Sequence, residues 1–157
     1  MRGKETGQRS LSSYVSQQDR IAADHPLRAM RQMVDGVLQR LSGRFAKMYS
    51  DRGRPSIPPE QLLRALLIQA LYTVRSERQL MEQLNYDLLF RCFVGLSMDD
   101  TVWDATVFTK NRERLLQADV AQAFFEEVVQ KADILGARDD GKTVFAHNNV
   151  RKVPTSL

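Results

Sequence analysis

The segment from Leu62 to Val74, LLRALLIQALYTV, is apolar at almost every position around a helix. A helix of this kind is stable only when other elements cover it on most sides, so the segment predicts a central helix in a core of several helices. It is shorter than the roughly 20 apolar residues that cross a membrane, and Arg64 and Gln69 interrupt it. We therefore expect a soluble helical protein without a membrane-spanning segment.

An amphipathic helix is predicted before the central one. Because proline is well tolerated in a first helical turn, we expect this helix to begin near Pro26, with Asp24 as its cap. Apolar residues recur at helical spacing from Leu27 to Met48 and predict one buried face. The glycine and proline within residues 50–55 end this helix, and a proline pair at 58 and 59 starts the next.

Capping signals predict further helices after the central one. Ser76 and Asp119 each precede a glutamine by three residues, which is the spacing of a capping box. Asp104 is the expected cap of a helix that runs to about residue 116, because its side chain can accept a hydrogen bond from a free amide. Gly95 is the expected left-handed end of a short apolar helix.

These elements predict an all-α fold, and no alternation typical of strands competes with them. We expect a compact bundle of about five helices over residues 21–135, with a helix-turn-helix-like part. A flexible arm is expected at residues 1–20 and an irregular tail at residues 136–157. Since the amino end lacks the apolar stretch of a secretory signal, a cytoplasmic location is also expected.

Positive charge is concentrated at the start of the chain. Residues 1–54 contain eleven Lys or Arg against five Asp or Glu, a net charge of +6, whereas the whole chain carries +4. Such an excess is explained either by contact with phosphate groups or by a solvated basic helix face.

Few residues suggest metal, redox or hydrolytic chemistry. Cys92 is the only cysteine, which rules out a disulfide within one chain, and its apolar surroundings predict a small buried side chain. His25 and His147 have no partner at zinc-ligand spacing, so His25 is interpreted as a residue at the start of a helix and His147 as a tail residue. Asp99 and Asp100 are expected to cap or to be solvated. We expect no cofactor, no metal and no small-molecule substrate.

The run from Asp51 to Leu116, which begins DRGRPSIPPEQLLRALLIQAL and ends TVWDATVFTKNRERLL, closely resembles the N-terminal domain of InsH-like insertion-sequence transposases of the DDE class. In that family a helical DNA-binding region precedes a catalytic domain that cuts DNA with three carboxylates and metal ions. The resemblance covers approximately residues 12–135. It implies a DNA-binding domain that recognises the terminal inverted repeats of an insertion element in DNA transposition.

The catalytic part of the family is matched at one point only. The family places its first catalytic aspartate shortly after the helical domain, in a strand that reads roughly Val-Asp-Gly-Thr. Here only Asp140 and Gly141 agree with that strand, and no residues remain for the second aspartate or the glutamate. We therefore expect a chain truncated before the catalytic domain and without catalytic activity.

The helix predicted over residues 104–116 is the candidate DNA reader, because a helix-turn-helix protein presents the N-terminal part of its second helix to the major groove. Phe108 and Leu115 are seven residues apart and are expected to face inward, with Arg112 at the inner edge. The expected partner is double-stranded DNA at the element ends. The DNA-binding candidates are Thr106, Thr109, Lys110 and Arg114 on this helix, and Arg52, Arg54, Arg75 and Arg78 as phosphate contacts.

Two other functional interpretations remain. The apolar stripe from Leu27 to Met48 could pair with a helix of a second copy or of full-length transposase, which would make the chain a dimerisation or protein-interaction module. The chain could also be a nonfunctional remnant. Trp103 could stack on a base, but we expect it to join its helix to the core.

Overall fold

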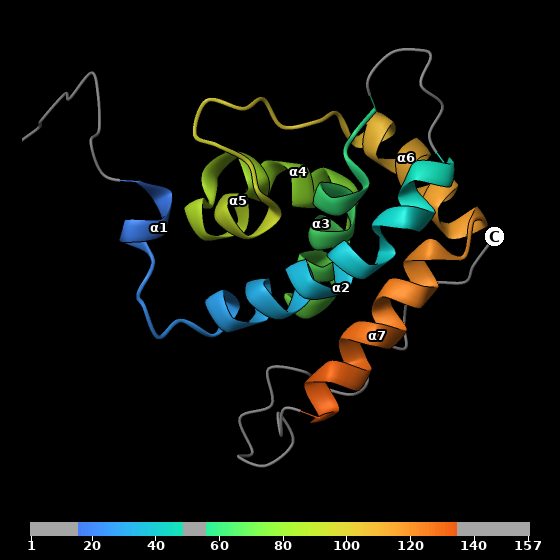
Figure 1. Ribbon diagram of the computed structural model, residues 1–157. Helices are drawn as coiled ribbons and strands as arrows, with labels where there is room; N and C mark the ends of the chain where they lie inside the picture. Colours follow the sequence, from blue (N-terminus) through green and yellow to red (C-terminus); the bar gives the residue numbers. More distant parts are fainter. Residues whose placement is uncertain (1–15, 49–55, 135–157) are drawn as a thin grey trace, which may run out of the picture.

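The computed structural model describes residues 16–48 and 56–134, and within these ranges it contains seven helices and no strand (Figure 1). The all-α prediction is confirmed, although about five helices are expected from the sequence. The helices are α1 (Gln17–Arg20), α2 (Pro26–Met48), α3 (Pro59–Leu71), α4 (Glu77–Tyr86), α5 (Leu88–Val94), α6 (Ala105–Gln117) and α7 (Val120–Ile134).

Helix α3 is the central helix, as its sequence predicts. Six of its residues are buried, and it contacts α2, α5 and α6. Leu62, Leu63 and Leu67 are completely inaccessible to solvent. The burial of five large apolar side chains on one helix, Leu62, Leu63, Leu66, Leu67 and Ile68, explains why nearly every position of this segment is apolar, and it makes α3 a principal source of stability.

Helices α2 and α7 lie along each other across the molecule, although they are far apart in the sequence (Figure 1). The predicted apolar stripe of α2 is buried, with Val34 and Val37 fully enclosed. Phe124 and Val128 of α7 belong to the same hydrophobic cluster as these valines. The stripe is therefore occupied by the chain's own core.

Three of the predicted helix caps are confirmed. The hydroxyl of Ser76 accepts a hydrogen bond from the Gln79 amide at 3.1 Å, and the carboxylate of Asp104 accepts one from the Thr106 amide at 2.7 Å. Gly95 has φ of 92° and ends α5 in the left-handed conformation. A side chain at Gly95 would be strained there and would also meet the guanidinium groups of Arg31 and Arg64 at 3.4 to 3.5 Å.

Other local predictions are wrong or incomplete. The first turn of α2 is capped by His25, whose Nδ1 accepts from the Leu27 amide at 3.2 Å, and not by Asp24. Asp119 has φ of 55°, so it forms the tight α6–α7 connection instead of the extended backbone of a side-chain cap. Within the arm predicted at residues 1–20, Gln17–Arg20 form α1. Residues 1–15 of that arm, residues 50–55, and the tail at residues 136–157 with His147 and Asp140 lie outside the described residues.

Candidate nucleic-acid interface

Helix α6 is held in place by its inner face. Phe108 and Leu115 are fully buried, which confirms the orientation predicted from their spacing. Trp103 packs against the core and stacks on Phe108, with ring centroids 6.1 Å apart and an angle of 23° between the rings. Asn111, which is 8% exposed, donates from Nδ2 to the Val107 carbonyl at 2.8 Å. The start of the helix is therefore attached to the core through Trp103 and Phe108, as expected for Trp103.

The outer face of α6 exposes three of the four DNA-binding candidates predicted on this helix. Thr106, Lys110 and Arg114 are exposed. They recur at intervals of four residues, so they follow one another along the same side of the helix. Val107 lies next to them and is 46% exposed. Val107 is not among the candidates predicted from the sequence. Because it does not share the seven-residue spacing of the inward-facing Phe108 and Leu115, its exposure could have been predicted.

Thr109 lies at the junction of α6 and α4. Its hydroxyl can donate to the Glu77 carboxylate or to the Ala105 carbonyl, the latter at 2.8 Å. Arg112 forms an ion pair with Glu77 at 2.6 Å, which agrees with its predicted structural role. The hydroxyl of Thr109 is thus engaged within the protein, and this residue is better suited to joining the two helices than to reading a base.

The first turn of α6 carries a carboxylate that remains ionised. The amide hydrogen bond from Thr106 lowers the pKa of Asp104 below its usual value, and the nearby positive charge of Arg78 lowers it further. A carboxylate at a helix N-terminus is also favoured by the helix dipole. Asp104 therefore organises the start of the helix, and Arg78 lies close to that start.

The remaining basic candidates have different positions. Arg75 and Arg78 are exposed at and just after the turn between α3 and α4. Arg52 and Arg54 lie outside the described residues. Of the eight predicted DNA-binding residues, the structure thus places five on the surface: Thr106, Lys110 and Arg114 on α6, Arg78 in the first turn of α4, and Arg75 in the turn before α4.

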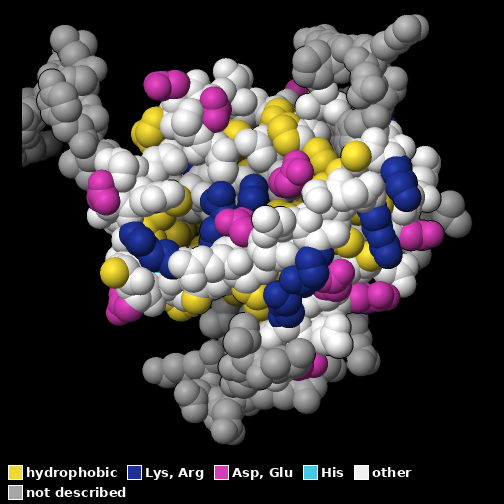
Figure 2. All heavy atoms as spheres, viewed as in Figure 1, with side chains coloured by type: hydrophobic (Ala, Val, Ile, Leu, Met, Phe, Trp, Pro, Cys, Tyr) yellow, Lys and Arg dark blue, Asp and Glu magenta, His cyan; other side chains and the backbone are white. Residues whose placement is uncertain are grey.

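Several arginines of α2 are engaged by other parts of the protein. Arg28 donates to the carbonyls of Gln18 and Ile21, the latter at 2.7 Å, and so ties α1 to α2. Arg40 forms an ion pair with Glu127 of α7 at 2.7 Å. Figure 2 shows Lys and Arg side chains in separate groups with Asp and Glu between them on this face of the molecule. The charge excess at the start of the sequence is therefore only partly available for phosphate contact.

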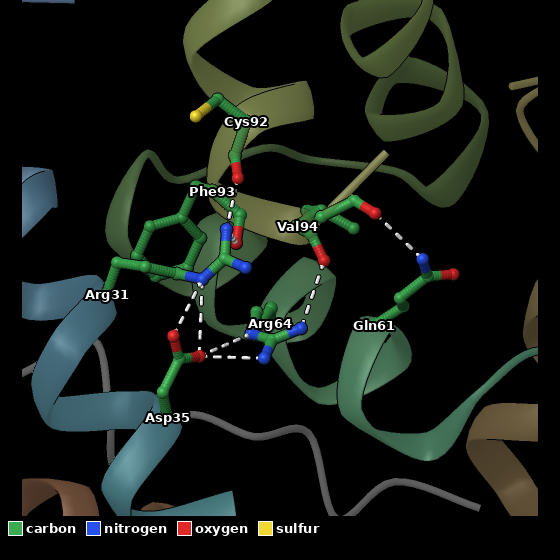
Figure 3. A network of polar contacts seen from close by, with 8 residues as sticks. Arg31, Asp35, Gln61, Arg64, Cys92, Phe93 and Val94 are labelled. Atoms are coloured by element: carbon green, nitrogen blue, oxygen red, sulfur yellow. Dashed lines mark hydrogen bonds and ion pairs between the residues drawn. The ribbon is translucent and has the colours of Figure 1, made fainter. Parts of the chain in front are cut away.

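Arg31 and Arg64 form a polar network around Asp35 and the end of α5 (Figure 3). Arg64 donates to the Asp35 carboxylate at 2.7 Å and to the Val94 carbonyl at 3.3 Å, while Arg31 donates to the Phe93 carbonyl at 2.9 Å. Burial, reinforced by the charge of Arg31, lowers the pKa of Arg64. The guanidinium groups satisfy carbonyls at a helix C-terminus, where positive charge is favoured.

Arg91 organises the loop that leads towards α6. It is 5% exposed and donates to the carbonyls of Leu84 at 3.0 Å and Asp100 at 2.6 Å, and also to that of Ser97. The Ser97 amide donates to the Asp100 carboxylate at 2.7 Å and lowers the pKa of that group. Asp100 therefore caps a turn, as predicted. Arg91 connects the end of α4, the end of α5 and the loop in one unit.

Three further observations concern metal ligands, Cys92 and membrane-spanning helices. Within residues 16–48 and 56–134, no three His, Cys, Asp or Glu side chains are grouped so that they could hold a metal ion. Cys92 is partly exposed, whereas a buried side chain is predicted. None of the helices in these two ranges is long and apolar enough to cross a membrane.

Comparison with known proteins identifies the family. Residues 15–114 match the transposase domain known as DUF772, and the chain therefore belongs to this family. The match contains α1 to α5 and most of α6, and it stops before α7. No curated protein and no solved structure matches the chain. The family agrees with the transposase resemblance of the sequence and suggests a role in transposition.

Proposed function

We propose that this helical domain binds double-stranded DNA at the terminal inverted repeats of an insertion element, as the DNA-binding N-terminal domain of an InsH-like transposase. The observation that carries the proposal is the outer face of α6. A rigidly anchored helix exposes Thr106, Lys110 and Arg114 in one row, while Phe108 and Leu115 hold its opposite side. A surface helix of this kind can enter a major groove.

The surrounding charges support phosphate contact next to the groove. Arg78 is exposed near the start of α6, with the exposed Arg75 three residues before it in the chain, and long cationic side chains beside a reading helix typically fix the orientation of a protein on a duplex. Hydroxyl and amino groups such as those of Thr106 and Lys110 are suitable for the polar base edges. DNA binding would take place in the cytoplasm, and a second copy or full-length transposase as an additional partner would have to bind outside the buried stripe of α2.

Replacing Lys110 and Arg114 together with alanine is expected to weaken binding about tenfold, because two cations that can form charge-assisted hydrogen bonds with DNA are removed. Each phosphate interaction removed in this way should also reduce the slope of log affinity against log salt by about 0.9. Fluorescence anisotropy is the measurement, with one duplex that carries the inverted repeat and one random duplex of equal length.

The matched control is the double replacement of Arg44 and Lys47 with alanine. Both residues are exposed on α2, and the change removes the same charge from another helix. We expect this variant to retain most of the affinity and the preference for the repeat. Equally weakened binding by the two variants would mean that charge alone matters and would remove α6 from the proposal, whereas equal binding of both duplexes would contradict recognition of element ends.

We further propose that these 157 residues bind DNA without cutting it. Several carboxylates of the described core already have structural tasks: Asp35 pairs with Arg64, Glu77 with Arg112, and Asp104 caps α6. A supercoiled plasmid that carries the inverted repeats is therefore expected to remain supercoiled with the protein and Mg²⁺ or Mn²⁺. Nicking that disappears in the Asp140→Asn variant would contradict this proposal.

A further inference from the structure

The N-terminal half of α6 has an apolar side chain on its otherwise polar outer face. Val107 is 46% exposed, whereas its neighbour Phe108 is fully buried. Val107 lies beside Thr106 and one turn before Lys110 on the outer surface of the helix. Exposed valines are not unusual by themselves, so its significance depends on what this face contacts.

The backbone around Val107 is held firmly. The Asp104 carboxylate caps the turn through the Thr106 amide, and the Val107 carbonyl accepts both within the helix and from Asn111 Nδ2 at 2.8 Å. Phe108 and Trp103 anchor the same turn to the core. A β-branched side chain on such a turn has little rotamer freedom, so its methyl groups are presented in one orientation.

We infer that Val107 is a specificity-determining residue that contacts the C5 methyl group of a thymine in the major groove. This inference rests on the proposed function, in which the N-terminal part of α6 enters the groove. The thymine methyl is the apolar group that distinguishes an A·T pair on the major-groove side, and apolar side chains recognise it by contact. Lys110 and Arg114 supply the charge complementarity that places a duplex against this face.

The test compares duplexes that differ only in this methyl group. Duplexes that bind the wild-type protein are first selected from a random pool, and the selected sequence is then prepared with thymine and with uracil in its place. Uracil pairs like thymine but lacks the methyl, so the wild-type protein should bind the uracil duplex about threefold more weakly for each thymine methyl that Val107 touches. Val107→Ala keeps only one methyl group, so it should discriminate less between the two duplexes than the wild-type protein does, and alanine favours the helix, so the variant should fold.

The possible outcomes test the inference about Val107 separately from the proposed function. Discrimination by the wild-type protein that is clearly reduced in Val107→Ala supports the inference. If both proteins discriminate equally, or if neither does while the selected sequence is still preferred over random DNA, Val107 does not read thymine but DNA binding by this domain stands. Failure to enrich any sequence, together with weak binding of all duplexes, would overturn the proposed function and the inference with it.

Discussion

A chain that ends at Gln117, directly after α6, is expected not to fold cooperatively. It would lack α7, which buries Val120, Phe124, Phe125 and Val128 in the common core. The burial of four large apolar side chains contributes about 6 to 12 kcal/mol, which is comparable to the entire stability of a typical domain. The defect should appear as reduced helicity by circular dichroism and as a shallow, non-cooperative thermal transition.

The matched control is a chain that ends at Ile134 and keeps all seven helices described. We expect this chain to melt in one cooperative transition. The comparison has a practical consequence, because the family match stops at residue 114 although the core continues into α7. A sharp transition in the chain that ends at Gln117 would show that α2 does not need α7 to cover its apolar face.

Much of the fold could be predicted from the sequence because its signals are local. The apolar run of α3, the hydroxyl of Ser76 and the carboxylate of Asp104 act on residues within one or two turns. Gly95 likewise has a conformation that few other residues adopt at low cost. The cap predicted for α2 is wrong because His25 and Asp24 are both able to cap a first helical turn, and His25 does so. The cap predicted at Asp119 is wrong because aspartate, a common capping residue, also fits the left-handed turn found there.

The candidate site was less predictable because its side chains depend on partners distant in the sequence. From spacing alone, Thr109 is expected at the surface of its helix and Arg112 at the inner edge. Both side chains contact Glu77 because α4 packs against α6, and the sequence does not show this. Similarly, the pair of Arg31 and Asp35 is suggested by their spacing of four residues, whereas the contribution of Arg64 is not. Charge counts along a sequence do not show which cations are already paired.

The excess of positive charge at the start of the chain suggested contact with phosphate groups, and the structure reduces the number of cations that can make such contacts. The charge count alone directs attention to the basic first third, yet Arg28, Arg31 and Arg40 on α2 hold neighbouring helices together. The surface that we propose for DNA lies later in the chain, on α6, where the local net charge is small but the basic side chains share one face. For locating a candidate DNA-binding surface, the positions of the cations on an anchored helix are thus more informative than the net charge of a segment.

The loop before α6 depends on Arg91, and we expect Arg91→Met to be strongly destabilising. Methionine preserves much of the apolar length but donates no hydrogen bond, so the carbonyls of Leu84, Ser97 and Asp100 are left without this donor. Hydrogen bonds from a charged group contribute about 1.5 to 3 kcal/mol each, and partial access of water to the loop reduces their sum. A decrease of about 3 kcal/mol in the free energy of unfolding is expected, measured by urea denaturation.

The same replacement at Arg40 provides the control, because its ion pair with Glu127 leaves the arginine side chain 47% exposed. Arg40→Met should cost less than about 1 kcal/mol, as is usual for an exposed pair. Since Arg91 also positions the chain that leads into the first turn of α6, Arg91→Met should reduce DNA affinity even at temperatures where the protein remains folded. Equal stability of the two variants would show that water replaces the buried guanidinium at no cost in stability. Unchanged DNA affinity of Arg91→Met would show that the loop does not determine the orientation of α6.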